Sequence, residues 1–393
     1  MAVEQSGGSS QSEYQALKQL IFDQFTAYEA GLVQANLPDP FLTEARLHPA
    51  DDTSFLPNHE LLHARRTLVG ALGMMANLVA SPAETLMIES LAHHRSAALS
   101  VVTESEVATA LDEAGQALPL AELSKRVKVQ EYTLVHALRL LINTCGIFSE
   151  PRSGVFANNR ASLLLVKGSP VLAFARWQSW YSLGAAPYIS KNWRASPKLG
   201  DSGTVFDAAA AEAWGFRGTG KDMWAWANEN HPDRIVEFGQ AMDVMNTVCA
   251  KAVTTRMTFA NYPRSLQIGN SSLVADYPWD KLPAGATVVD VGGGQGNMLR
   301  AILNKHSQLR GVLQDRPEVV APGRDAFERK APHLIHANRI ECEVYDFFTP
   351  QPRKGMDVYT MRFIIHDWPD KRCVEILKLQ AAAMSRKSKL LIM

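Results

Sequence analysis

The sequence contains few cysteines and no tight cluster of them. Its 393 residues include 4 cysteines, at positions 145, 249, 342 and 373, and no two of them form a C-x-x-C pair. Disulfide frameworks and structural zinc sites both need cysteines at short, repeated spacings. The scarcity therefore argues against both, predicts no metal site, and is typical of a protein in a reducing cytoplasm.

The chain also lacks an excess of charge and a long apolar run. Lysine plus arginine and aspartate plus glutamate both number 40, so no overall field attracts nucleic acid or an anionic membrane. No apolar stretch reaches the ~20 residues of a transmembrane helix. Residues 1–12 are polar and rich in glycine and serine, unlike a signal peptide. We expect a soluble protein with no nucleic-acid or membrane partner.

What is present is enough chain for several domains, because 393 residues exceed one compact core. Changes in composition predict four parts: 1–84, 85–165, 166–265 and 266–393. Apolar residues at helical spacing predict helices over 14–35, 57–79 and 85–99. Since these apolar faces have no obvious partner within the chain, we expect them to pair with a second copy in a homodimer.

Residues 85–165 have the pattern of a winged helix, a mainly α module. Helices are predicted over 107–114 and 131–143, with a short helical stretch between them, and a small two-stranded hairpin follows. In isolation this module suggests DNA binding, with 131–143 as the recognition helix. That helix offers mainly His136 and Arg139 to read bases, so we favour a winged helix used for dimerisation.

A glycine cluster follows an apolar run in the last part. Residues 287–291 predict a buried strand, and residues 297–306 predict a helix. Between them, Gly292, Gly294 and Gly296 form a turn whose backbone N–H groups can approach a nucleotide. The dehydrogenase pattern G-x-G-x-x-G would need glycine at position 297, where Asn297 stands. The pattern here is instead D-x-G-x-G-x-G, beginning at Asp290.

Acids also follow the next two predicted strands. The strand over 311–314 ends at Asp315, and the strand over 340–345 ends at Asp346 and Phe347. With strands over 358–361 and 389–393, they predict a parallel, doubly wound α/β sheet of the Rossmann type. Ligands of such sheets bind at the carboxyl ends of the strands. Asp315 is placed to accept ribose hydroxyls, and Asp346 to meet an adenine amino group beside the Phe347 ring.

The segment between the winged helix and this sheet is rich in aromatic residues, and its predicted helix over 234–257 is rich in methionine. Most aromatic side chains pack a core. Their concentration beside a nucleotide-binding sheet nevertheless suits the lining of a hydrophobic substrate cavity, and thioethers adapt to flat ligands. The candidate substrate residues are Trp214, Phe238, Met242 and Met245.

These residues, together with the segment His366-Asp367-Trp368, resemble a known family. The chain is similar to the class I S-adenosylmethionine-dependent O-methyltransferases of plant and fungal secondary metabolism, the type with an N-terminal winged-helix dimerisation domain. The resemblance extends from about residue 85 to the last residue.

The resemblance implies a role for each matching residue. Asp290 and the three glycines would hold the methionine part of S-adenosylmethionine, and Asp315 its ribose. Asp346 and Phe347 would hold the adenine. Arg362 would be a basic residue close to the cofactor, and the ring of Trp368 would pack near the adenosine. His366 would be the general base.

The expected reaction is methyl transfer to a hydroxyl of a small aromatic or polyketide-like metabolite. With an ordinary pKa near ~6.5, neutral His366 can take a proton from a phenol or enol at neutral pH. The resulting oxyanion attacks the sulfonium methyl in line, and most of the acceleration comes from holding the two reactants in position.

One feature departs from the family pattern. In the family the sheet continues past the fifth strand with two further strands, and two acids beyond that strand flank the histidine. This sequence ends at Met393, at or within the fifth strand. We therefore expect either a truncated form or a relative that does not methylate. The second would be a pericyclase-like or dehydratase-like enzyme, or an inactive paralogue that pairs with an active subunit.

Overall fold

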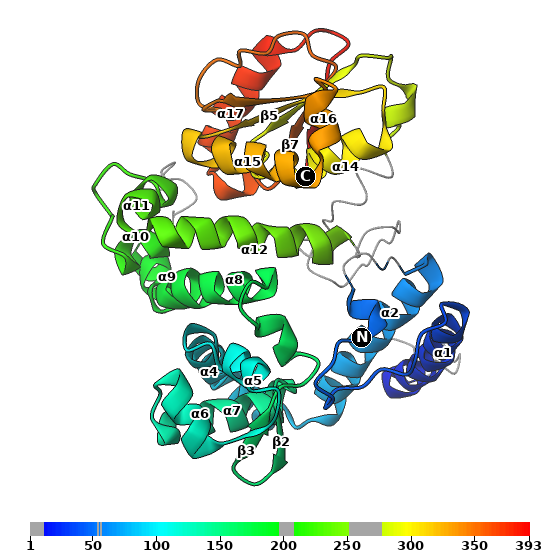
Figure 1. The fold of residues 1–393 in the computed structure, drawn as a ribbon, viewed down its shortest axis with the longest axis vertical. Helices are drawn as coiled ribbons and strands as arrows, with labels where there is room; N and C mark the ends of the chain where they lie inside the picture. Colours follow the sequence, from blue (N-terminus) through cyan, green and yellow to red (C-terminus); the bar gives the residue numbers. More distant parts are fainter. Residues whose placement is uncertain (1–11, 53–54, 56, 196–207, 251–276) are drawn as a thin grey trace, which may run out of the picture. The chain divides into compact units, whose positions relative to one another are not determined.

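The computed structural model describes residues 12–52, 55, 57–195, 208–250 and 277–393 (Figure 1). The chain divides into two compact units, Met1–Lys167 and Gly168–Met393. The finer division into four parts stays a prediction, and its boundary at 265/266 falls outside the described residues.

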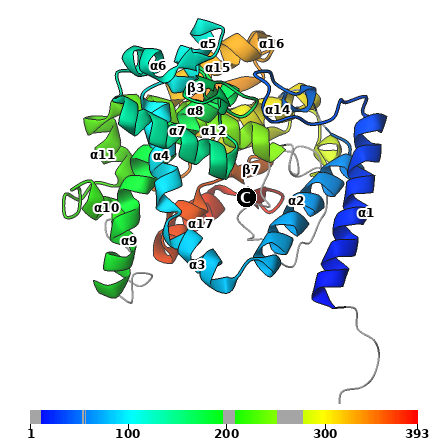
Figure 2. The same cartoon turned by 90° about the horizontal axis from the view of Figure 1, so that it is seen from below.

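The first unit begins with two long helices that lie side by side (Figure 2): α1 (Glu13–Gln34) and α2 (His59–Val79). Their backbones come close at Gly31, where an added Cβ would stand 3.0 Å from Cδ1 of Leu61. A short 3-10 helix, η1 (Pro49–Asp51), lies on the connection between them. The predicted helices over 14–35 and 57–79 are therefore confirmed.

The predicted single helix over 85–99 is wrong, because this stretch forms two helices, α3 (Pro82–Ser90) and α4 (His93–Glu104). The helix α3 ends at Ser90 and has no buried residue, whereas Ala98 and Val102 of α4 are buried.

Large apolar side chains stay exposed on α3, among them Leu86 at 70% and Met87 at 67%. In the described part of the chain, no helix by itself is long and apolar enough to cross a membrane. The stretches Glu60–Val79 and Pro82–Glu104 reach that length and apolarity only together, across a bend of 114°.

The rest of the first unit has the three helices and the hairpin that were predicted there, and its identity as a winged helix stays a prediction. Its helices are α5 (Val107–Ala114), α6 (Leu120–Val127) and α7 (Glu131–Cys145), and the 3-10 helix η2 (Ser162–Leu165) follows them. Its antiparallel sheet has the strand order β1-β3-β2, with β1 (Leu118–Pro119), β2 (Ser149–Arg152) and β3 (Val155–Ala157). The strand β1 was not predicted, because two residues are too short for a periodic signal.

Arg139 of α7, the helix that would read DNA in a DNA-binding winged helix, forms an ion pair with Glu150 of β2. Its Nη2 and Nε donate to the two carboxylate oxygens of Glu150, at 2.7 and 3.0 Å. This ion pair raises the pKa of Arg139 and lowers the pKa of Glu150. The side chain that the sequence offers for reading bases is therefore already engaged within the module.

The second unit begins with helices that carry the aromatic residues. They are α8 (Pro170–Trp177), the π-helix η3 (Gln178–Ser182), α9 (Leu183–Ala195), α10 (Ala209–Ala213), α11 (Met223–Asn230) and α12 (Pro232–Ala250). Of the helix predicted over 234–257, the residues after 250 lie outside the described residues.

The sheet of the second unit is parallel and five-stranded, with the order β6-β5-β4-β7-β8. Its strands are β4 (Thr287–Val291), β5 (Arg310–Asp315), β6 (Ile340–Val344), β7 (Val358–Met361) and β8 (Lys389–Ile392). Every predicted strand is confirmed within one residue at each end. The order reverses between β4 and β7, and ligands of doubly wound sheets bind at such a reversal.

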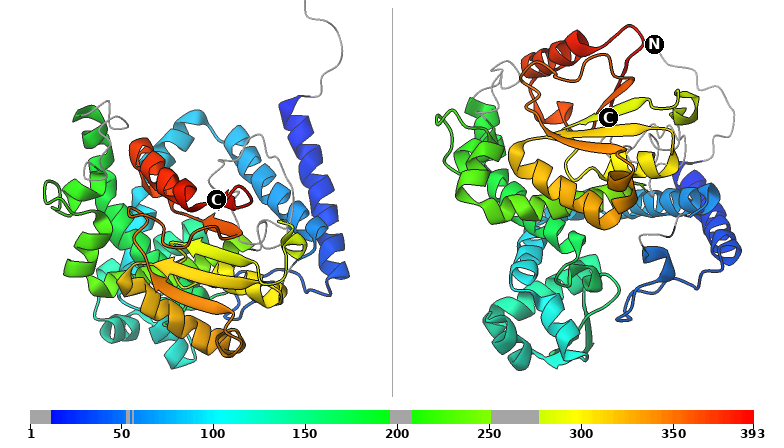
Figure 3. Two further views of the ribbon diagram at one scale, coloured as in Figure 1. Left: turned by 90° about the horizontal axis from the view of Figure 1, so that it is seen from above. Right: turned by 45° about the horizontal axis from the view of Figure 1, so that its top comes forward.

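Helices cover both faces of this sheet (Figure 3). The helices α14 (Asn297–Lys305), α15 (Pro317–Lys330) and α16 (Pro332–His336) pack on one face, together with the short η7 (Trp279–Lys281). The helix α17 (Asp370–Ala383) packs on the other face, after the short η8 (Ile365–Asp367). Neighbours such as Val288 and Val289 face opposite layers, as strand alternation requires, and both are fully buried.

Candidate cofactor and active site

The carboxyl ends of β4, β5 and β6 place the three predicted acids on one edge of the sheet. Asp290 lies in β4, Asp315 is the last residue of β5, and Asp346 comes two residues after β6. The register pairs Val291 with Gln314 and Asp315 with Val344, so the strands end almost level.

The glycine turn is fastened to the end of β5 by backbone hydrogen bonds. Gly292 N and Gly293 N donate to the carbonyl of Gln314 at 2.8 and 3.2 Å, and Gly294 N donates to Oδ2 of Asp315 at 2.8 Å. Gly292, Gly294 and Gly296 all have positive φ, at 67°, 59° and 67°. This conformation strains any residue with a Cβ, so the turn depends on glycine.

The surroundings of the glycines differ. A Cβ on Gly292 would stand 2.4 Å from Ile364, and one on Gly296 would stand 2.4 Å from the ring of Phe327. A Cβ on Gly294 would meet no atom within 4 Å. Gly292 and Gly296 are therefore needed for packing, whereas Gly294 leaves room in front of the turn for a ligand.

Asp290 is buried, with 2% of its surface exposed. Burial raises its pKa to about 6, although the hydroxyl of Thr360 donates to its Oδ1 at 2.7 Å and Arg362 acts in the opposite direction to burial. A carboxyl group in this state gains from a cationic ligand, because such a ligand stabilises its ionised form.

Asp315 accepts a backbone N–H on each oxygen, from Gly294 to Oδ2 and from Arg316 to Oδ1, both at 2.8 Å. Burial raises its pKa, and these two hydrogen bonds counteract that rise. A carboxylate oxygen can accept more than one hydrogen bond, so a fixed pair of acceptors remains for two neighbouring hydroxyls.

Asp346 and Phe347 form a turn after β6. Oδ1 of Asp346 accepts from Phe348 N at 2.9 Å, while the side chain of Asp346 stays exposed. The Phe347 ring meets the Trp368 ring edge to face, with centroids 5.8 Å apart. The predicted neighbourhood of Phe347 and Trp368 is therefore present.

His366 lies in η8, just beyond the end of β7, and its side chain is 60% exposed. Its Nε2 is 3.4 Å from Oδ1 of Asp367, and its ring stacks on Phe363 with centroids 5.6 Å apart. Phe363 has φ of 55°, which is unusual for a residue with a Cβ. The guanidinium of Arg362 lies over the same ring, 4.4 Å from its centroid.

This arrangement agrees with comparisons to known proteins. Residues 264–393 match the O-methyltransferase domain family. The O-methyltransferase OME1 of Pyricularia oryzae is 30% identical over 400 residues, which span 98% of this chain and 72% of that protein. The O-methyltransferase tpcA of Aspergillus fumigatus is 29% identical over 359 residues, or 86% of this chain and 72% of that protein.

The chain belongs to the O-methyltransferase family. Its cofactor is S-adenosylmethionine, and the open space before Gly294 together with the buried Asp290 and the partly buried Asp315 fits that cofactor.

Solved structures agree on the fold of this O-methyltransferase. The mitomycin 7-O-methyltransferase MmcR superposes with a TM-score of 0.61 at 27% identity, over 81% of each chain. A structure described as a pericyclic reaction enzyme superposes with a TM-score of 0.64 at 19% identity, over 95% of this chain and 83% of that one. At that identity, the second match speaks for the fold alone.

The predicted substrate residues of the methyltransferase fall into two adjoining clusters. Phe238 and Met242 pack with Trp177, whose ring centroid is 4.8 Å from that of Phe238. Trp214 belongs to the neighbouring cluster, and Trp180 connects the two, at 4.9 Å from Trp214 and 5.4 Å from Trp177. The side chain of Met245, on α12, lies outside the described residues.

Contacts join these aromatic helices to the carboxyl edge of the sheet. The guanidinium of Arg316, next to Asp315, lies 5.7 Å from the ring centroid of Trp224 on α11. A Cβ on Gly239 of α12 would stand 3.3 Å from Gln295 Nε2 in the glycine turn. Burial, with a smaller contribution from the Asp367 carboxylate, raises the pKa of Tyr181 to about 12.

Several residues of the site escaped sequence reasoning. Thr360 reaches Asp290 only because β7 pairs with β4 in a register that sets them opposite each other. Ile364 and Arg316 likewise meet Gly292 and Trp224 through tertiary packing. The only signal in the sequence was their position beside predicted strand ends.

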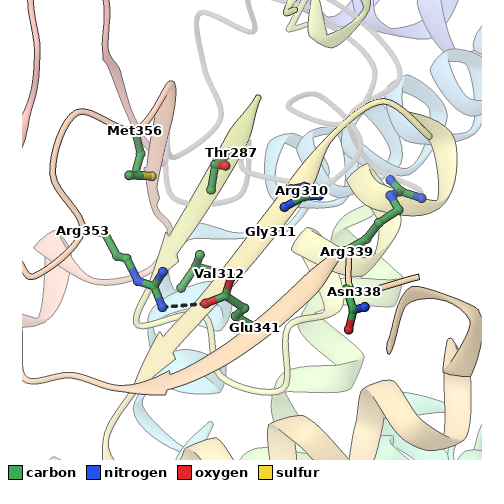
Figure 4. Close-up of a pocket in the computed structure, with 9 residues that line it drawn as sticks. All are labelled: Thr287, Arg310, Gly311, Val312, Asn338, Arg339, Glu341, Arg353 and Met356. Atoms are coloured by element: carbon green, nitrogen blue, oxygen red, sulfur yellow. Dashed lines mark hydrogen bonds and ion pairs between the residues drawn. The ribbon is translucent and has the colours of Figure 1, made fainter. Parts of the chain in front are cut away.

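A pocket at the opposite end of the sheet is separate from this site. Figure 4 shows its lining, which includes Thr287, Arg310, Arg339 and Arg353 near the beginnings of the strands. Arg339 donates to the carbonyls of Leu303, His306 and Leu309, and Arg353 pairs with Glu341 at 2.7 Å. Arg339 and Arg353 therefore have structural partners, and the three acids and the glycine turn predicted to bind the cofactor lie at the other end of the sheet.

Proposed function

We propose that the protein transfers the methyl group of S-adenosylmethionine to a hydroxyl of a small aromatic or polyketide-like secondary metabolite, with His366 as general base. The observation that carries the proposal is the shared edge of the sheet. The acids, the glycine turn and His366 all lie at the carboxyl ends of the strands, where the aromatic helices also make contact.

Different residues at the carboxyl edge of the sheet would bind different parts of the cofactor. Asp290 and the glycine turn would hold the cationic methionine part, and Asp315 would accept hydrogen bonds from the ribose hydroxyls. Asp346 and the ring of Phe347 would receive the adenine. Arg362, whose charge stabilises ionised Asp290, would set the field beside the cofactor. The bound cofactor supplies an electrophilic methyl group on a sulfonium.

His366 would remove the proton of the acceptor hydroxyl. As the O–H bond breaks, the proton passes to the imidazole, and the oxygen forms its bond to the methyl carbon while the carbon–sulfur bond breaks. The carboxylate of Asp367 lies 3.4 Å from Nε2 of this imidazole. The exposed imidazole is able to meet an acceptor delivered from the aromatic side.

The aromatic clusters support a flat, largely apolar acceptor. Phe238, Met242 and Trp214 offer ring faces and a thioether. The indole Nε1 of Trp214 is buried and has no hydrogen-bond partner among the described residues. A buried donor of this kind is stabilised by an oxygen of a ligand, which fits a hydroxylated or carbonyl-bearing metabolite.

The test is incubation with methyl-labelled S-adenosylmethionine and a panel of phenols and enolic polyketides. We expect label in the acceptor and an equal amount of S-adenosylhomocysteine. His366→Ala should lower kcat about 10²–10⁴-fold, as expected for a lost general base, with cofactor affinity unchanged. His333→Ala, which removes an exposed histidine paired with Asn304, is the control.

The alternative is a non-methylating enzyme on the same scaffold, or an inactive subunit. Turnover of an acceptor that forms no S-adenosylhomocysteine and survives His366→Ala would establish the first. Tight cofactor binding with no turnover of any acceptor would support the second and contradict the proposal.

We also propose that the protein forms a homodimer through its N-terminal helices and winged helix. The exposed apolar residues Leu86, Met87, Ile88 and Leu91 lie on one short helix and at its end, and such a patch marks an interaction surface. Leu86→Glu with Met87→Glu should shift the mass measured by light scattering from dimer to monomer. Ile189→Glu, an equally exposed apolar residue on α9, should leave the mass unchanged. A wild-type monomer would refute the dimer.

A further inference from the structure

A chain of buried amide side chains runs beneath the cofactor edge of the sheet. It contains Gln314 at the end of β5, Gln351 after β6 and Gln380 on α17, which are 0%, 2% and 0% exposed. Buried glutamine is uncommon, because an unpaired amide in the interior is destabilising. Three of them in contact therefore call for a physical explanation.

The hydrogen bonds of this chain are nearly complete. Gln314 and Gln351 form a reciprocal pair, in which Nε2 of each donates to Oε1 of the other at 2.9 Å. The second hydrogen of Gln314 Nε2 goes to Glu343, also at 2.9 Å, and that of Gln351 Nε2 goes to Gln380. These partners also fix which end of each amide is oxygen.

The chain continues to the turn that bears Asp346. Gln380 Nε2 donates to the hydroxyl of Tyr345 at 3.0 Å, and that hydroxyl donates to the carbonyl of Thr349 at 3.0 Å. Thr349 stabilises the turn that begins at Asp346, since its N and Oγ1 both donate to the Asp346 carbonyl. The last amide of the chain therefore reaches the proposed adenine contact.

Gln314, the first amide of the chain, lies beside the glycine turn and Asp315. The backbone carbonyl of Gln314 accepts the N–H groups of Gly292 and Gly293, and Asp315 is the next residue. The carbonyl of Asp315 accepts from Tyr345 N at 2.8 Å, which ties the ends of β5 and β6 together. Gln314 therefore belongs to both networks: its side chain joins the chain of amides, and its backbone joins the glycine turn beside the ribose acid.

We infer that Gln314, Gln351 and Gln380 are positioning residues for S-adenosylmethionine, and that they hold Asp315 and the Asp346 turn at the spacing of one bound adenosine. The inference rests on the proposed role of Asp315. Apolar residues would fill the same volume, but they would not couple the two strand ends by directed hydrogen bonds.

The test uses methionine, which is close to glutamine in shape but forms no amide hydrogen bonds. Gln314→Met and Gln351→Met should each raise the Kd for S-adenosylhomocysteine and for 5′-methylthioadenosine about tenfold, the size expected for broken buried hydrogen bonds. The two ligands share the adenosine, so both should lose the same factor. The value of kcat at saturating cofactor should stay within about twofold of wild type, because His366 is not in the chain of amides.

The matched control is Gln308→Met. Gln308 donates to the carbonyl of Trp279 at 3.2 Å, close to the beginning of β5 and away from the cofactor edge. It should lower Tm without changing either Kd. The double variant Gln314→Met/Gln351→Met should lose no more affinity than either single variant, since the pair acts as a unit.

Unchanged affinity in both Gln314→Met and Gln351→Met, or an equal loss in Gln308→Met, would overturn the inference. If the first two variants do not fold, Gln380→Met reports on the outer link with a smaller disturbance. Asp315→Asn separates this failure from that of the proposed function. If Asp315→Asn still binds adenosine ligands fully, the role of Asp315 is wrong. If Asp315→Asn does not bind these ligands but the glutamine variants bind them as well as the wild type does, only the positioning role of the glutamines is wrong.

Discussion

The carboxyl edge of the sheet and the aromatic helices α8–α12 belong to one unit, yet different interactions build them. At the sheet edge, short side chains and backbone N–H groups are fixed by hydrogen bonds of 2.7–2.8 Å around Asp290 and Asp315. Among the helices, rings such as Trp177, Trp180 and Phe238 pack at 4.8–5.4 Å between centroids.

The difference matches two kinds of ligand recognition. A cofactor with fixed hydroxyls and charges needs acceptors that do not move, and strand ends provide them. An apolar acceptor needs a cavity of matching shape. Where that cavity is lined by rings from several helices, a single substitution can alter its shape. We therefore expect substitutions at the sheet edge to alter cofactor affinity, and substitutions among the rings to alter stability and choice of acceptor.

The largest effect is expected at Trp177, which is buried and contacts Trp180, Tyr181, Trp224 and Phe238. Trp177→Ala should lower the free energy of unfolding by about 3–5 kcal/mol, since it removes a large buried ring. Denaturant titration measures the loss, and Trp177→Phe should lose less. Cofactor affinity, measured where the variant is folded, should be unchanged. A parallel loss of cofactor affinity would show that the two regions are not separable.

A pair of glycine substitutions comes next. Both Gly294 and Gly296 have positive φ, but only a Cβ on Gly296 would collide, at 2.4 Å from Phe327. Gly296→Ala should therefore destabilise by about 2–5 kcal/mol, from strain plus overpacking. Gly294→Ala should destabilise by about 1–2 kcal/mol, from strain alone.

Cofactor affinity sharpens the same comparison. The Cβ of Gly294→Ala would enter the open space before the turn. For each kcal/mol of lost stability, this variant should therefore lose more affinity for the cofactor, measured by calorimetry, than Gly296→Ala loses. Equal ratios for the two variants would mean that this space does not receive the cofactor.

The pH dependence of Asp290 follows from its raised pKa. Because the folded pKa of about 6 exceeds the ordinary 3.8, the protonated form favours folding. That contribution is complete below pH 3.8 and is lost as the pH rises through 6. Relative to Asp290→Asn, the wild type without cofactor should lose at most about 3 kcal/mol of unfolding free energy between pH 4 and pH 7, at ~1.4 kcal/mol per pKa unit.

Cofactor binding should show the opposite trend. The cationic methionine part prefers ionised Asp290, so affinity should rise as the pH passes through 6. Titrations at pH 5, 6 and 7 measure this rise. An equally steep rise in Asp290→Asn would place the titrating group elsewhere.

The smallest effect is expected at Arg316, which links the two regions through the ring of Trp224. Arg316→Gln should weaken the influence of bound cofactor on acceptor affinity by about 0.5–1 kcal/mol, the size of an exposed cation–π contact. The measurement is acceptor Kd with and without S-adenosylhomocysteine. Arg324→Gln, on the outer side of α15, serves as control, and equal effects in both would contradict a specific link.

Strong local patterns explain which predictions were confirmed. The run Thr287–Val291 is β-branched throughout apart from its acid and is followed by glycines, so strand, turn and helix were each identified correctly. The break at Leu91 was missed because apolar spacing continues through it. The contact of Thr360 with Asp290 was missed because it depends on strand register, which leaves no local trace.

The sequence by itself determined the cofactor edge, because each acid lies at the end of a strand or just after it, and parallel strands end at the same edge. Asp290, Asp315, Asp346 and His366 could therefore be placed together before any coordinates. Tertiary structure alone decided what surrounds them. The glutamine chain, the Thr360 hydrogen bond and the two ring clusters join residues tens of positions apart. Such contacts depend on strand order and helix packing, which spacing along the chain does not specify.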